Sequence, residues 1–397
     1  MSVFKEMRPA DLGKHIFVAN RSGKKLARAV MRSLMSVVQK PDKPFAKLQN
    51  LVVHSFADSE MNVVGQFGDI SPTKNDDEDD TFRGSIAHLF TSFRQEAPDA
   101  CAAVDIWELF LTLDMLMNSG VKEINLVYFC QIGQRMHKKV PHQPFTAALA
   151  LRLAQAAAGG AHILRNIMII HPHNQTSQGF VEGTKVDDFL PVAATVNYLK
   201  SNPSINGKKI IVVATDAGAK AYAEYVANDL GVESLVVMNK DRKGLKRPES
   251  FVASGLQWID GDPDAVYIIC DDIVSSGETA ENAKDDIEKI VGHPITTYLF
   301  ATHGCFNKKG KETAEDRLRR IGMHAVVSDT IPRSKKYVKE NSDIITFYSL
   351  APYIAELIIC DILGKSTGVI IRRQIARAQM GLPSINEILL NNELAPL

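Results

Sequence analysis

Two adjacent carboxylates and a turn of small polar residues follow one apolar run of the chain. Asp271 and Asp272 come directly after residues 265–270, which read AVYIIC. Residues 275–279 then offer hydroxyl groups, a glycine and backbone N–H groups where a helix is expected to begin. Such N–H groups and the helix dipole bind phosphate, and the two acids can accept hydrogen bonds from a sugar diol or hold Mg²⁺ through water. These residue types predict a site for a phosphorylated sugar, and the alternative is that the acids only cap a turn.

Two further side chains follow other apolar runs. Asp216 comes shortly after residues 209–214, and His173 comes shortly after residues 167–170. A carboxylate at the end of a buried strand is suited to Mg²⁺, with a turn cap as the alternative. Histidine is a poor intrinsic choice for this hard cation, so residue type alone does not assign His173 to a metal.

The elements that position these residues repeat one pattern: an apolar run, a polar or Gly-rich turn, then a helical segment. The expected strands are residues 124–129, 167–170, 209–214 and 265–270. The expected helices begin near Pro144, Lys220 and Ala280, and glycines at 159–160 and 231 end the first two. Strands that are apolar throughout are typical of a parallel sheet with both faces covered. At 397 residues, two such α/β sheets fit better than one.

Composition narrows the function classes. Lys plus Arg total 46 and Asp plus Glu total 46, so the chain lacks the net basic charge of a typical nucleic-acid binder. No uncharged apolar run reaches the length of about 18 residues that a membrane span needs, and residues 1–14 lack the apolar core of a signal peptide. The five cysteines are isolated, without CxxC spacing, which favours free thiols in a reducing cytosol. We therefore expect a cytoplasmic protein.

Residues 266–279 resemble the signature that binds ribose 5-phosphate and phosphoribosyl pyrophosphate (PRPP) in phosphoribosyltransferase-type folds. Other segments resemble, in the same order, motifs of the ribose-phosphate pyrophosphokinase (PRPP synthetase) family. These segments are residues 18–27, 56–60, 104–109, 171–180, 215–220, 238–242, 302–304 and 349–352. The chain is identified as a divergent member of that family.

The resemblance implies two similar phosphoribosyltransferase-type domains, each a mainly parallel sheet flanked by helices. Residues 1–188 would form an N-terminal pyrophosphokinase domain with an acidic insertion at about 69–83, and residues 189–348 a PRPP-binding domain. Residues 349–397 would form a helical segment and a C-terminal extension.

The implied reaction is Mg-dependent diphosphoryl transfer from ATP to the anomeric hydroxyl of ribose 5-phosphate, giving PRPP and AMP for nucleotide biosynthesis. Catalysis would fall to Lys240 and Arg242, in a cationic segment suited to a mobile lid or, alternatively, to a solvated loop. Mg²⁺ would be held by His173 and Asp216. ATP would be bound by Phe56, Asp58, Glu60, Arg135 and His173. The acceptor would be bound by Asp271, Asp272, Ser275, Ser276, Gly277 and Thr279.

Phe56, Asp58 and Glu60 reach the ATP of a neighbouring subunit in the family, so the resemblance also implies a homo-oligomer with shared active sites. The match at Arg135 needs a one-residue gap. No nucleic acid or membrane is expected as a partner.

Four residues depart from the family pattern: His171, Ala219, Asp241 and Glu278. Glu278 is the most consequential, because it places a carboxylate in the phosphate turn. One alternative is therefore the same chemistry on a larger 5-phosphorylated ribose, such as ADP-ribose. Another is a catalytically weak regulatory subunit, although Lys240, Arg242, His173 and Asp216 are all present.

Overall fold

The computed structural model describes residues 13–37, 48–58, 60–66, 82–96, 101–239, 251–254, 261–365 and 367. Among these residues the contacts define two compact units. Unit 1 holds the residues up to Phe189, Thr330–Pro332 and those from Ala351 onward, and unit 2 holds Leu190–Asp329 and Arg333–Leu350.

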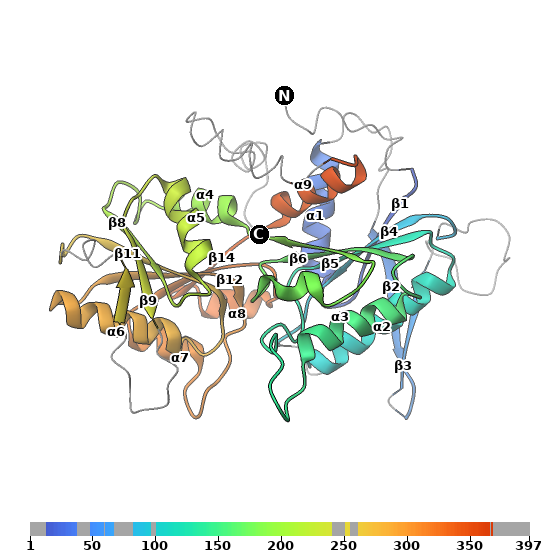
Figure 1. Ribbon diagram of the computed structural model, residues 1–397, viewed down its shortest axis with the longest axis horizontal. Helices are drawn as coiled ribbons and strands as arrows, with labels where there is room; N and C mark the ends of the chain where they lie inside the picture. The colour runs from blue at the N-terminus through green and yellow to red at the C-terminus, as the bar shows by residue number, and fades with distance from the viewer. Residues whose placement is uncertain are drawn as a thin grey trace. The chain divides into compact units, whose positions relative to one another are not determined.

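The described part of unit 1 contains a seven-stranded sheet in the order β3-β2-β1-β4-β5-β6-β7 (Figure 1). All neighbouring strands are parallel except β2 and β3, which form an antiparallel hairpin. The strands are β1 (His15–Ala19), β2 (Leu48–Ser55), β3 (Met61–Gln66), β4 (Ile86–Thr91), β5 (Glu123–Tyr128), β6 (Leu164–Ile170) and β7 (Lys185–Phe189).

The described part of unit 2 repeats this arrangement with a sheet in the order β10-β9-β8-β11-β12-β13-β14. Again only the outer pair, β9 and β10, is antiparallel. The strands are β8 (Ile210–Ala214), β9 (Leu235–Asn239), β10 (Phe251–Ser254), β11 (Val266–Val274), β12 (Thr296–Gly304), β13 (His324–Ser328) and β14 (Ile345–Tyr348). The predicted α/β class with two similar, mainly parallel sheets is confirmed.

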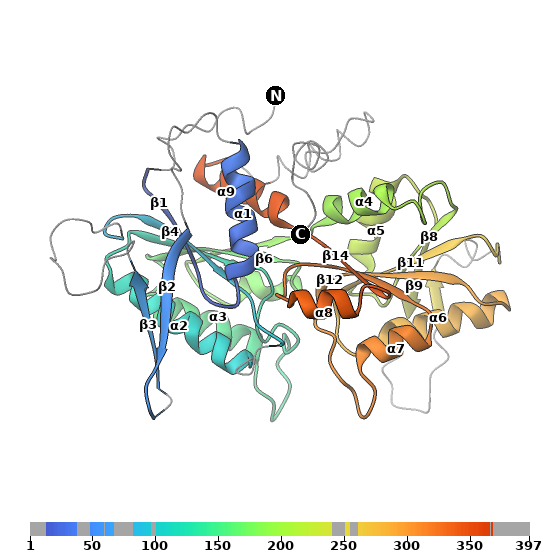
Figure 2. The ribbon, with the colours of Figure 1, turned by 180° about the vertical axis from the view of Figure 1, so that it is seen from behind.

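Helices cover both faces of each sheet, as the apolar strands require. In unit 1, α1 and α9 lie on one face and α2 and α3 on the other (Figures 1 and 2). In unit 2, α4 and α5 cover one face, and α6 and α7 cover the other. The helices are α1 (Lys24–Val37), α2 (Ala102–Asn118), α3 (Thr146–Ala157), α4 (Val192–Ser201), α5 (Lys220–Leu230), α6 (Glu278–Val291), α7 (Ala314–Arg320), α8 (Lys335–Glu340) and α9 (Ala351–Ile362).

The alternation of side chains along β8 shows how the two faces are filled. Ile211 and Val213 pack in the cluster beneath α6 and α7, whereas Val212 and Ala214 pack in the cluster beneath α4 and α5. All four residues are fully buried. Because both faces are apolar, the polar residues of this unit gather where the strands end.

None of the described helices combines the length and the apolar composition needed to span a bilayer. The five cysteines are free thiols, of which Cys101 is exposed and the other four are buried.

Candidate active site

The acid pair of unit 2 lies on β11 itself and not in the turn after it. The neighbouring strand β8 ends at Ala214, opposite Cys270, whereas β11 continues beside β12 as far as Val274. Asp271 and Asp272 therefore extend past the end of β8. The sequence analysis ended the strand at Cys270 because it followed the apolar run, and pairing with the longer β12 carries the strand further.

Asp216 lies just beyond the end of β8, at the same edge of the sheet. One oxygen of its carboxylate accepts hydrogen bonds from the backbone N–H groups of Gly218 (2.8 Å) and Ala219 (3.1 Å). Asp216 thus holds the turn that leads into α5. Ala219 has a φ of −78°, so the replacement of a family glycine by alanine introduces no strain at this position.

Two neighbouring carboxylates act on Asp271 at this edge. Burial, and then the charges of Asp272 and Asp216, raise the pKa of Asp271 well above its usual range. A carboxylate oxygen of Asp271 also accepts a hydrogen bond from the backbone N–H of Asp272, at 3.0 Å. Bound groups that carry hydroxyl or positive charge would relieve this concentration of negative charge.

The turn after β11 leads directly into the N-terminus of α6. Gly277 is the N-cap of α6 and has a φ of +76°, a left-handed conformation that favours glycine. Ser275, Ser276 and Thr279 flank it and are partly buried. The structure thus brings together all six residues predicted for the acceptor and places Asp216 near them.

Unit 1 contains a second group of predicted residues, formed by the loops after β5 and β6. The backbone N–H of His173 donates to the side-chain carbonyl of Gln134 at 3.0 Å. The rings of His173 and His137 meet edge to face, with centroids 5.2 Å apart. Arg135 is exposed in the same loop as Gln134. The structure therefore joins Arg135 and His173 in one neighbourhood, and it adds His137 and Gln134, which the sequence analysis did not single out.

The predicted ATP-binding residues Phe56, Asp58 and Glu60 occupy the tip of the β2–β3 hairpin. The backbone N–H of Phe56 donates to the carbonyl of Glu60 at 2.8 Å, and the N–H of Glu60 donates to the carboxylate of Asp58 at 3.1 Å. The side chain of Phe56 is 55% exposed. An exposed aromatic ring at a hairpin tip is available for contact with a ligand or with another chain.

The predicted catalytic residues Lys240 and Arg242 lie outside the described residues, between the antiparallel strands β9 and β10. Most of the predicted acidic insertion at about 69–83 and most of the C-terminal extension also lie outside them.

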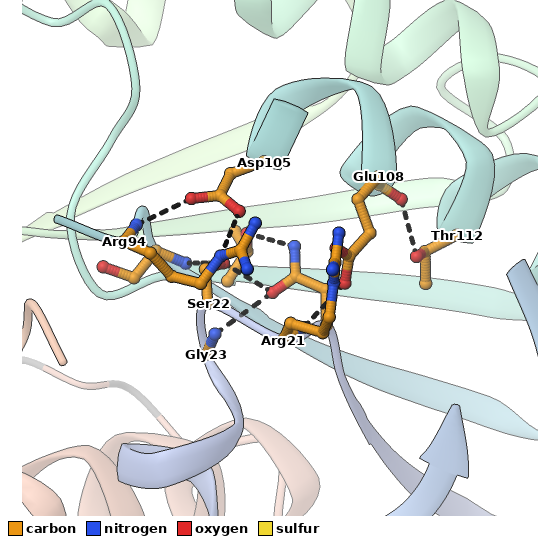
Figure 3. Close-up of polar contacts among 10 residues, drawn as sticks. Arg21, Ser22, Gly23, Arg94, Asp105, Glu108 and Thr112 are labelled. Carbon is orange, nitrogen blue, oxygen red and sulfur yellow. Dashed lines mark hydrogen bonds and ion pairs between the residues drawn. The ribbon is translucent and has the colours of Figure 1, made fainter. Parts of the chain in front are cut away.

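Two ion pairs with buried carboxylates on α2 hold the segments after β1 and β4 in unit 1 (Figure 3). Glu108 on α2 accepts hydrogen bonds from the backbone N–H and the Nε of Arg21, both at 2.6 Å. Asp105 accepts in the same way from the backbone N–H (2.6 Å) and the Nε (2.7 Å) of Arg94. Both carboxylates are buried, so the acids of segment 104–109 serve here to hold two strand ends to one helix.

Asn20 links the same two strand ends. Its side-chain amide donates to the hydroxyl of Thr91 at 2.8 Å, and its carbonyl oxygen accepts from the hydroxyl of Ser22 at 2.8 Å and the N–H of Gly23 at 3.2 Å. An added Cβ at Gly23 would lie 2.5 Å from the carbonyl oxygen of Phe90, so only glycine fits. The segment 18–27 therefore forms a rigid turn.

The chain is similar to curated proteins over most of its length. No family model matches the chain. The ribose-phosphate pyrophosphokinase of Aquifex aeolicus is 27% identical over 316 residues, which cover 79% of this chain and 88% of the relative. The ribose-phosphate pyrophosphokinase of Helicobacter hepaticus is 27% identical over 315 residues, which cover 78% of this chain and 87% of that relative.

Structural comparison supports the fold. The crystal structure of phosphoribosylpyrophosphate synthetase from Mycobacterium smegmatis superposes with a TM-score of 0.67 at 22% identity, covering 88% of this chain and 99% of that one. Over most of its length the chain is thus similar in sequence to ribose-phosphate pyrophosphokinases, and it shares the fold of the solved synthetase.

Proposed function

We propose that the protein is a ribose-phosphate diphosphokinase that transfers the diphosphoryl group of ATP to the anomeric hydroxyl of ribose 5-phosphate. The observation that carries the proposal is the joint placement of Asp271, Asp272 and the Gly277 turn in a fold shared with PRPP synthetase. The matched relatives are named for this activity.

The acceptor is proposed to bind at the edge of unit 2. The N–H groups and hydroxyls of residues 275–279 would hold the 5-phosphate at the N-terminus of α6. Asp271 and Asp272 would accept hydrogen bonds from the ribose hydroxyls.

In the reaction, the anomeric oxygen attacks the β-phosphorus of ATP and loses its proton. The bond from that phosphorus to the oxygen that bridges it to the α-phosphorus breaks, and AMP leaves. Lys240 and Arg242 are proposed to stabilise the negative charge that develops on the transferred group. Arg135, His173 and the hairpin residues Phe56, Asp58 and Glu60 are proposed to position ATP, the hairpin acting from a neighbouring subunit.

Asp216 of unit 2 and His173 of unit 1 are each proposed as a ligand of Mg²⁺, the role that the family resemblance implies for them. No three described His, Cys, Asp or Glu side chains are arranged to enclose a metal ion. Mg²⁺ usually takes only one or two carboxylates and completes its shell with water and phosphate oxygens. The second carboxylate oxygen of Asp216, which the turn does not use, suits this role. When bound, Mg²⁺ would neutralise charge on the ATP phosphates.

The test is an assay of AMP and PRPP formation by the purified protein with ATP, Mg²⁺ and ribose 5-phosphate. ADP-ribose serves as a second acceptor in a parallel assay. Release of AMP that depends on ribose 5-phosphate supports the proposal. Release with ADP-ribose alone would move the activity to the larger acceptor, and an inert protein would contradict both.

A further inference from the structure

The loop between β12 and α7 is fixed to the turn proposed to bind the acceptor phosphate. The backbone N–H groups of Cys305 and Phe306 both donate to the carbonyl of Val274, at 2.9 and 3.1 Å. The N–H of Asn307 donates to the carbonyl of Ser275 at 2.8 Å, and its side-chain amide donates to the hydroxyl of Ser275 at 3.1 Å. The two segments therefore keep one relative position.

The side chain of Arg333 is hydrogen-bonded to the start of this loop. Its Nη2 donates to the carbonyls of Gly304 and Cys305, at 2.9 and 2.6 Å, and the residue is only 7% exposed. The guanidinium also lies 4.5 Å from the ring centre of Tyr337 and 5.7 Å from that of Phe306. A cation so enclosed and bonded leaves the loop little freedom to shift.

Lys309, in this loop, lies next to Glu278, the first residue of α6. The ammonium of Lys309 donates to the carboxylate of Glu278, the acid that departs from the family pattern. The backbone of Lys309 is held in turn by paired hydrogen bonds with Glu312, at 3.0 and 3.3 Å. The side chains of Glu278 and Lys309 are 45% and 56% exposed. An ion pair this exposed adds little to folding stability, so stability alone does not explain it.

The other acid in the first turn of α6 is also neutralised. Glu281 pairs with Arg317 and, at 2.8 Å, with Arg320. Each carboxylate at this helix terminus therefore has a basic partner from the segment between β12 and β13. Without Lys309, a phosphate dianion at the N–H groups of the turn would meet more of the negative charge of Glu278.

We infer that Lys309 is a specificity-determining residue of the acceptor-phosphate site: it compensates Glu278, so that an acid within the phosphate turn does not repel a 5-phosphate. This inference rests on the proposed function. Glu278 also stabilises α6 as an acid in its first turn, but that role affects folding and not phosphate binding.

The experiment is a double-mutant cycle on the full-length protein, with variants Lys309→Ala, Glu278→Gln and their combination. The matched control is Lys308→Ala, which removes the same charge one residue away and whose side chain makes no ion pair with a described residue. Calorimetry gives the Kd for ribose 5-phosphate, and initial rates give the KM for each substrate. Thermal unfolding checks that each variant is folded, and Lys309→Met, which keeps the aliphatic stem, replaces Lys309→Ala if that variant is not.

Lys309→Ala is expected to raise the Kd and the KM for ribose 5-phosphate about tenfold, the effect of roughly 1.4 kcal/mol, and to leave the KM for ATP within about twofold. Adding Glu278→Gln should cancel most of that increase. The inference would be overturned if Lys309→Ala left the Kd for ribose 5-phosphate unchanged, or if Lys308→Ala raised that Kd equally. It would also be overturned if Lys309→Ala raised the Kd just as much when Glu278→Gln is present. A wild-type protein that does not bind ribose 5-phosphate would overturn it as well.

The two proposals fail separately. A wild-type protein that binds ribose 5-phosphate but releases no AMP contradicts the proposed function, while the series of Kd values still decides the role of Lys309.

Discussion

Arg21 and Glu108 form a two-point contact in which one buried carboxylate binds both the backbone N–H and the Nε of the arginine, each at 2.6 Å. The contact ties the turn after β1 to α2. Glu108 is 1% exposed, whereas Arg21 is 35% exposed. The carboxylate is therefore shielded from water and relies on this arginine to neutralise its charge. The arginine itself remains partly accessible to solvent.

Replacing Glu108 by Gln should destabilise unit 1. The amide keeps the shape but loses the charge and one acceptor, so we expect a loss of about 2–3 kcal/mol in the free energy of unfolding. Urea unfolding followed by circular dichroism measures it. Glu123→Gln is the control, because its ion pairs to Lys122 and Arg165 are 3.6 Å long and exposed. Glu123→Gln should lose less than about 0.5 kcal/mol in the free energy of unfolding. Equal losses in the two variants would contradict the assigned role of Glu108.

Protonation of His88 should weaken the fold at acid pH. Burial, and then the charge of His15, lower the pKa of His88 to about 3. The unfolded chain binds this proton near pH 6.5 and the folded chain only near pH 3, so stability falls as the pH falls through this window. The slope for this one group approaches about 1.4 kcal/mol per pH unit.

His88→Gln isolates this contribution. The variant keeps a polar partner for His15, whose ring nitrogen lies 2.9 Å from that of His88. Its unfolding free energy should depend less on pH than that of the wild type between pH 6.5 and 3. Parallel curves for the two proteins would show that His88 does not titrate as its burial requires.

Lys240→Ala should act on turnover more than on ATP binding. Removing one fixed cation from a transferred phosphoryl group typically costs about 10²–10³-fold in kcat, and we expect a loss of this size. Steady-state rates measure it. Lys246→Ala, in the same cationic segment, should lose less than about tenfold. An unchanged kcat in Lys240→Ala would remove this residue from the mechanism.

The shared active site can be tested by complementation. If the hairpin tip with Asp58 completes the site of a neighbouring subunit, Asp58→Ala and Lys240→Ala damage different halves of one site. Co-expressed chains should then regain activity that neither variant has alone. Light scattering should show an oligomer, and an active monomer would contradict this arrangement.

The sequence was sufficient for the fold class and for the glycine turn that opens α6, for a physical reason. Strands such as residues 210–214 are buried on both faces, so their apolar runs stand out and the polar residues after them mark the strand ends. The left-handed Gly277 is likewise expected in a turn of small residues that opens a helix.

The ion pairs around the site could not be predicted in this way. Arg21 and Glu108 are 87 positions apart, and Glu278 and Lys309 are 31 apart. Only the order of strands in each sheet brings these residues together, and that order is not encoded in local periodicity. No local sequence pattern therefore indicates that Lys309 pairs with Glu278, the first residue of α6.

The most direct test of the central claim is a measurement of AMP and PRPP produced from ATP by the wild-type protein with Mg²⁺, with and without ribose 5-phosphate. Equal amounts of the two products are expected, formed only when ribose 5-phosphate is present and lost in Lys240→Ala. A protein that binds both substrates and forms neither product would contradict it.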